Sequence, residues 1–80
     1  MKTIYLEWLD AQSVDGWESI SELRKRELAR VKTLGFLVAE TDDAYIVANS
    51  IHSEDAEEPD AACVMAVPKC AVVLRREVTI

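Results

Sequence analysis

The sequence predicts a mainly β protein with some helix: a small five-stranded, strongly bent antiparallel barrel, with one helix between the first and second strands. Apolar residues alternate with a period of two over several short segments, which is the period of a half-buried strand. Tight connections join these segments. The chain has 80 residues, and 50% of them are hydrophobic, so we expect one small barrel domain over residues 1–80.

The first strand is expected over residues 2–9, which are rich in strand-forming residue types. Side chains two positions apart lie on the same face of a strand. Ile4, Leu6 and Trp8 therefore share one face. Residues 10–13 end the alternation and favour a connection at this point.

One helix is expected from about 16 to 29. Asp15 is the expected N-cap, and Glu18, three residues later, completes a pair that is typical of helix starts. Apolar residues form a stripe along one side of this helix, at Trp17, Ile20, Leu23 and Leu28. Charged residues surround the stripe, so we expect the helix to lie on the surface of the sheet.

A hairpin is expected after the helix. From Val31 onward the apolar period is two, and we expect Phe36 in the core. The alternation stops at residues 40–43, where aspartates favour a tight turn. The return strand is expected over residues 45–52.

Two further strands are expected over residues 62–67 and 70–78, after an acidic loop over residues 53–61. Pro68 lies between them, where it removes one backbone donor and turns the chain sharply. This short turn resembles the corner that Sm-like barrels place between their last two strands. The helix differs from most Sm-like proteins, which carry theirs before the first strand.

The resemblance to Sm-like proteins implies a homo-oligomer, because those proteins commonly form rings by pairing the edge strands of neighbouring subunits. A chain of this size has a marginal core and usually needs a disulfide, a metal or a partner subunit. Cys63 and Cys70 match no redox or zinc spacing, and His52 is the only histidine. We therefore expect no metal site. The sequence has no export signal and the protein is expected to lie in a reducing compartment, so we also expect no structural disulfide, and an oligomer is the remaining source of stability.

No enzyme and no cofactor are expected, since the sequence has no nucleophile elbow and no glycine-rich phosphate loop. The formal net charge of −6 opposes binding to polymeric nucleic acid. Glu7 comes too early for a secretory signal, and no apolar run approaches the roughly 20 residues that span a bilayer. We expect a cytoplasmic protein that does not bind a membrane.

Short motifs spread over most of the chain carry a second resemblance. They are Trp8-Leu9-Asp10-Ala11, Ser13, Asp15, Trp17, Gly35-Phe36-Leu37, Val47-Ala48-Asn49-Ser50, Val67-Pro68-Lys69 and Val72-Val73-Leu74-Arg75-Arg76-Glu77. Together they resemble short accessory proteins encoded by tailed bacteriophages and prophages. The resemblance implies a phage protein made in the host cytoplasm, and it carries over no catalytic residue.

Small phage oligomers, including some Sm-like ones, can sequester signalling molecules of bacterial immunity, so the resemblance implies a counter-defence protein that binds a small anionic nucleotide between subunits. Arginines are expected to bind the phosphate of this nucleotide, and aromatic residues are expected to stack on its base. Short polar side chains are expected to form hydrogen bonds with its remaining groups. The candidate residues are Trp8, Ser13, Asp15, Trp17, Arg24, Tyr45, Arg75 and Arg76. Tryptophans in so small a chain more often fill a core or an interface than stack on a base, and helix capping is the simpler explanation of Ser13 and Asp15.

Two alternatives from other classes stay open. The net charge of −6 suits an adaptor or inhibitor that docks on a host protein and imitates nucleic acid. A minor structural component of the virion is the other alternative. Pulldown from host lysate separates the first alternative from nucleotide sequestration.

Overall fold

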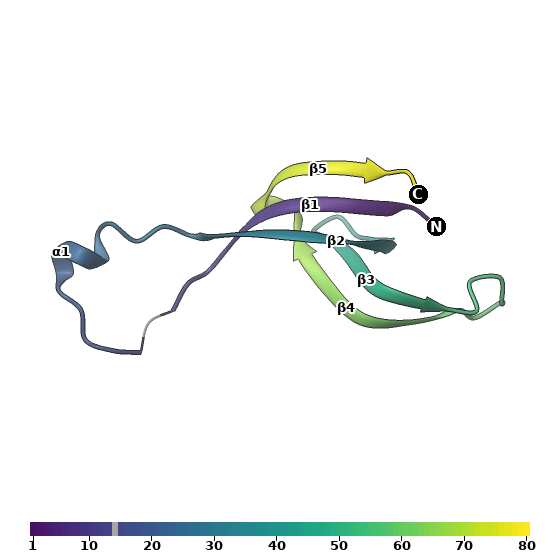
Figure 1. Cartoon of the computed structure of the whole chain (residues 1–80), viewed down its shortest axis with the longest axis horizontal. Coiled ribbons are helices and arrows are strands. Elements are labelled where there is room, and N and C mark those ends of the chain that lie inside the picture. The colour runs from purple at the N-terminus through teal and green to yellow at the C-terminus, as the bar shows by residue number, and fades with distance from the viewer. Residues whose placement is uncertain (14) are drawn as a thin grey trace.

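The structure is a computed structural model and describes residues 1–13 and 15–80. Five antiparallel strands form one sheet in the order β4-β3-β2-β1-β5 (Figure 1). The strands are β1 (Thr3–Asp10), β2 (Ala29–Glu40), β3 (Ala44–His52), β4 (Asp60–Pro68) and β5 (Val72–Val78). A helical turn α1 (Ile20–Leu23) follows β1, and a 3-10 turn η1 (Lys69–Ala71) separates β4 from β5. The predicted mainly β antiparallel class is confirmed.

The sheet is open. Every neighbouring pair in the strand order is antiparallel, and no ladder joins β4 to β5 within the described parts of the chain. The strands curve strongly, and β3 and β4 bend away from the plane of β1 and β5 (Figure 1). The expected closure into a barrel is therefore not confirmed, and β4 and β5 are the two edges.

The core lies against one face of β1, as the alternation predicted. Ile4 and Leu6 are fully buried and Trp8 is 7% exposed, while their neighbours in β1 are only half-buried. Val47 and Val67 pack on them from β3 and β4. The indole Nε1 of Trp8 donates a hydrogen bond to Thr33 Oγ1 over 3.0 Å, so the one polar atom of this core side chain has a partner. We call this face of the sheet the inner face.

Strands β2 and β3 approach each other closely at Gly35. A Cβ atom added there would lie 2.5 Å from the carbonyl oxygen of Ala48 and 2.8 Å from Val47 Cγ1. Only a residue without a side chain fits between β2 and β3 at this position. Phe36, the next residue, pairs with Ala48 and Thr3 on the face opposite Ile4, and it is half-buried there. The prediction that Phe36 belongs to the core is wrong, because the register turns it outward.

The expected helix over 16–29 is also wrong in its length. Between Asp10 and Ala29, which pair at the end of the β1–β2 ladder, residues 11–13 and 15–28 leave the sheet as a projection that we call the arm (Figure 1). Only Ile20–Leu23 is α-helical, and its N-cap is Ser19, whose hydroxyl accepts from the backbone N–H of Glu22 over 3.2 Å. Every described residue of the arm is exposed. An isolated helix of this length is marginal without a packed face, and the arm has none.

The molecule is elongated, with principal extents of 55 × 24 × 23 Å. The arm projects from one end, and the β3–β4 loop lies at the other (Figure 1). That loop, residues 53–59, begins at Ser53 with a φ of 56°, and a second positive φ of 55° occurs at Cys63 inside β4. Among the helices that the structure describes, none has the length and apolar character needed to cross a membrane.

Candidate functional site

Two cations lie over the ring of Tyr45 on the inner face. The Nζ of Lys69 is 5.2 Å from the ring centroid, and the guanidinium carbon of Arg75 is 5.5 Å from it. Both distances fall within the range of cation–π attraction. The three residues come from β3, η1 and β5, which are brought together only by the fold. We call them the Tyr45 cluster.

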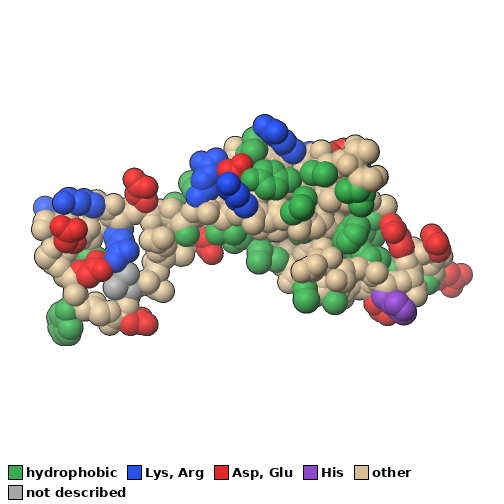
Figure 2. Space-filling model, in the orientation of Figure 1, with side chains coloured by type: hydrophobic (Ala, Val, Ile, Leu, Met, Phe, Trp, Pro, Cys, Tyr) green, Lys and Arg blue, Asp and Glu red, His purple; other side chains and the backbone are tan. Residues whose placement is uncertain are grey.

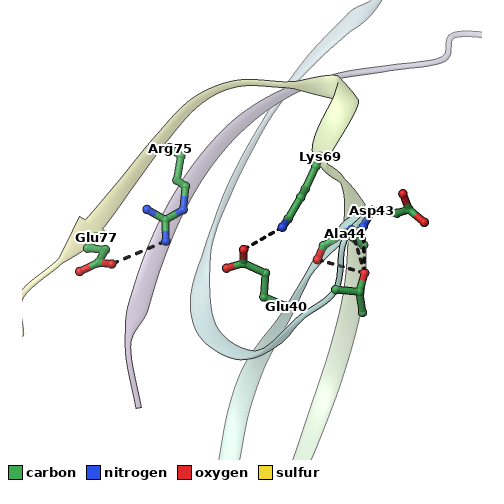
Figure 3. A network of polar contacts seen from close by, with 7 residues as sticks. Glu40, Asp43, Ala44, Lys69, Arg75 and Glu77 are labelled. Atoms are coloured by element: carbon green, nitrogen blue, oxygen red, sulfur yellow. Dashed lines mark hydrogen bonds and ion pairs between the residues drawn. The ribbon is translucent and has the colours of Figure 1, made fainter.

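Each of the two cations of the cluster lies beside a carboxylate, Lys69 beside Glu40 and Arg75 beside Glu77, which balances part of its charge (Figure 3). Lys69 Nζ donates to Glu40 over 2.7 Å, and Lys2 donates to Glu77 over 3.1 Å. Arg75 lies 3.6 Å from Glu77, which is an ion pair beyond hydrogen-bond distance. The hydrogen bond from Lys69 lowers the pKa of Glu40, and the same contact raises the pKa of Lys69. Lys69 therefore stays charged at neutral pH.

The backbone turn between β2 and β3 fixes the position of Lys69. Thr41 Oγ1 accepts from the backbone N–H groups of Asp43 and Ala44 over 3.3 and 3.0 Å, which closes the turn. The carbonyl of Asp43 then accepts from the backbone N–H of Lys69 over 2.7 Å. This bond holds η1 against the turn, and it places the Lys69 side chain over Glu40 (Figure 3).

The cluster has the chemistry of a binding site for an anion that carries a planar group. The side chains of Lys69 and Arg75 are 29% and 34% exposed, so an approaching ligand can reach them. A guanidinium offers a planar fork to phosphate oxygens, and a tyrosine ring offers a face to a base. Because Glu77 is 3.6 Å from Arg75, a phosphate group can compete for that cation.

The structure separates the two arginines of β5. Arg75 pairs with Leu6 and lies on the inner face, whereas Arg76 pairs with Tyr5 and lies on the opposite face, which we call the outer face. A bulge between Glu7 and Trp8 in the β1–β5 ladder shifts the register further along. Arg75 and Arg76 therefore cannot serve the same site within one subunit.

The other predicted residues lie elsewhere. Trp8 fills the core, so packing accounts for it. Ser13, Asp15, Trp17 and Arg24 belong to the arm, where Trp17 is fully exposed. Asp15 does not cap the helical turn, because that cap is Ser19. Within the described residues, no hydrogen bond or ion pair joins the arm to the Tyr45 cluster. Of the predicted set, the fold brings together Tyr45 and Arg75.

Sequence reasoning missed Lys69 and Glu40. Lys69 follows Pro68 directly, and its position after the corner was the one available signal. The hydrogen bond between Lys69 and Glu40 joins residues 29 positions apart, and no local sequence pattern predicts it.

Metal-ligating residues form no cluster of three or more in residues 1–13 and 15–80. Comparison with protein-family models, with curated proteins and with solved structures finds no match.

Proposed function

We propose that the protein is a non-enzymatic binding protein that forms homo-oligomers and holds a small nucleotide-type anion in pockets between subunits. One observation carries this proposal: Tyr45, Lys69 and Arg75 lie together, with Arg75 on an edge strand of an open sheet. An aromatic face and two cations match the base and the phosphate of a nucleotide.

The open edges support self-association. In β4, eight of nine residues are exposed, Val64 and Met65 among them. A long apolar edge strand invites pairing with another chain, because its backbone N–H and C=O groups on one side have no strand partner. Pairing β4 of one copy with β5 of the next would extend the antiparallel sheet around a ring, as Sm-like barrels do.

The same pairing would complete a pocket. Arg75 lies on β5, so the neighbour's β4 would run beside the Tyr45 cluster. The exposed Met65 of β4 pairs with Val47 and so lies on the inner face, where it offers an apolar wall for such a pocket. A phage accessory protein with pockets of this kind would act against host defence by sequestering a nucleotide-type immune signalling molecule.

Light scattering and calorimetry test the proposal together. We expect a mass above that of the monomer, and binding to at least one member of a panel of cyclic nucleotides and ADP-ribose derivatives. Arg75→Gln is expected to weaken that binding at least tenfold, whereas Lys25→Gln, in the exposed arm, leaves it unchanged. A monomer at every concentration, or no binding across the panel, would refute the proposal.

A second candidate function is supported by the acidic end of the molecule. The β3–β4 loop and the first residue of β4 carry five carboxylates, at Glu54, Asp55, Glu57, Glu58 and Asp60. Of these five carboxylates, only Glu54 has an ion-pair partner among the described residues, the N-terminal amine of Met1 at 2.8 Å. A free acidic loop suits an adaptor that imitates nucleic acid on a host protein. Retention of a host protein in pulldown, lost when Glu57 and Glu58 become Gln, would favour this candidate.

A further inference from the structure

The outer face of β5, β1 and β2 carries an excess of positive charge. The register places Arg76 and Leu34 on either side of Tyr5, and Lys32 directly beside Glu7. Arg30 lies two positions before Lys32 in β2, on the same face, and it pairs with Leu9 in the same ladder. Directly opposed residues point to the same side of a sheet, so all these side chains share the face opposite the core.

The cations outnumber the carboxylates on this face. Arg30, Lys32 and Arg76 are opposed by Glu7 alone, although the whole chain has a net charge of −6. Glu7 is already engaged, because it accepts from Arg30 Nε over 2.8 Å and from the hydroxyl of Tyr5 over 2.9 Å. The space-filling view shows Lys and Arg side chains gathered around one acidic group beside hydrophobic residues (Figure 2).

Lys32 and Arg76 have no ion-pair partner among the described residues. Both are exposed, and both extend from strands, which hold their backbone positions. They flank β1 on its two sides, so their Cα atoms are about 10 Å apart across the sheet and about 7 Å offset along it. Two long side chains at this spacing can hold adjacent phosphate groups over Tyr5.

We propose that this outer face is a second binding site, for a ligand that carries two or more phosphate groups. Arg76 supplies a planar fork for one phosphate, and Lys32 supplies a point charge for the next. Arg30 is held in place by Glu7 and adds a third cation at the end of the row. Half-buried Tyr5 and exposed Leu34 supply the apolar surface between them. Edge pairing of β5 would use backbone groups and leave this face open, so the site does not depend on assembly.

Titration of ¹⁵N-labelled protein with tripolyphosphate at low salt tests the site in the wild-type chain. We expect amide shifts on β1, the first half of β2 and β5. Calorimetry with the same probe is expected to show at least tenfold weaker binding for Lys32→Gln and for Arg76→Gln. Lys25→Gln, which alters an exposed lysine of the arm, is the matched control and should bind as the wild type does.

Glu7→Gln gives a response in the opposite direction, which damage to the fold would not produce. Removing the one carboxylate of the face is expected to tighten tripolyphosphate binding several-fold. Vesicles with anionic phospholipid form a second arm: retention on them that is lost with Arg76→Gln upholds the site and assigns the phosphates to a lipid surface.

Arg75→Gln separates this inference from the proposed function, since it alters the Tyr45 cluster alone. Loss of tripolyphosphate binding with Arg75→Gln but not with Arg76→Gln would place the anion on the inner face and overturn the inference. The absence of both amide shifts and vesicle binding would overturn it as well.

Discussion

Replacing Gly35 by alanine tests how closely β2 and β3 approach each other at this position. The added Cβ would lie 2.5 Å from the carbonyl oxygen of Ala48, where carbon and oxygen ordinarily stay about 3.3–3.6 Å apart. It would also lie 2.8 Å from Val47 Cγ1. The carbonyl belongs to the backbone of β3, so relief requires β2 and β3 to separate by nearly an ångström at this position.

The expected cost follows from these contacts. Overpacking a tight site costs about 1–3 kcal/mol, and a weakened ladder hydrogen bond adds about 1 kcal/mol. Alanine recovers about 0.4–1 kcal/mol by reducing the entropy of the unfolded chain. Gly35→Ala is therefore expected to destabilise the fold by about 2 kcal/mol. For a chain of this size, that corresponds to a Tm lower by about 8–16 °C.

The matched control is Gly16→Ala in the arm, where no atom lies within 4 Å of the added Cβ. This variant should keep the wild-type Tm or exceed it slightly, for the same entropic reason. Thermal unfolding followed by circular dichroism, at one fixed protein concentration, compares the three chains. Equal Tm values for Gly35→Ala and Gly16→Ala would show that β2 and β3 do not approach as closely as described.

Three further predictions concern other parts of the chain. Cys63→Gly should stabilise the fold by about 1 kcal/mol in urea unfolding, because glycine adopts the positive φ of 55° without strain; an unchanged midpoint would contradict this backbone conformation. Trp17→Ala should change stability by less than about 0.5 kcal/mol, since Trp17 is fully exposed, whereas Trp8→Ala should cost about 3–5 kcal/mol. Lys69 lowers the pKa of Glu40, so this contact stabilises the fold above the ordinary glutamate pKa and is lost as the pH falls through the lowered value. Glu40→Gln should therefore lose less stability than the wild type between pH 6 and pH 3, as measured by urea midpoints.

The strands could be predicted from the sequence because their signal is local. Ile4, Leu6 and Trp8 alternate with less buried residues, and this period of two holds whatever the partner strands are. The segments expected at 45–52 and 62–67 lie within β3 and β4 for the same reason. At most strand ends, the predicted boundary differs from the observed one by one or two residues, because turns compete with strand pairing there.

The length of the helix and the composition of the Tyr45 cluster could not be predicted from the sequence, because both depend on contacts between residues far apart in the chain. The stripe that contains Trp17 and Leu28 is a helical pattern, but it forms a helix only against a surface, and the arm leaves the sheet. Which face of the sheet Arg75 and Arg76 each occupy is set by the pairing of β5 with β1, and these two strands lie at opposite ends of the sequence. Lys69 joins the site because a backbone hydrogen bond holds η1 to the β2–β3 turn.

The position of the arm in the fold affects which parts of the sequence can change in evolution without loss of the fold. The arm lies between Asp10 and Ala29, which are paired neighbours in the β1–β2 ladder, so it is an insertion in a hairpin that is complete without it. Loop-closure entropy grows only with the logarithm of length, and replacing residues 11–28 by a two-residue turn would alter stability by only about 2 kcal/mol. Mutation, lengthening or exchange of this insertion leaves the buried residues of β1 untouched, because every described residue of the arm is exposed. Among related chains, the arm is therefore expected to diverge faster than the strands that carry it.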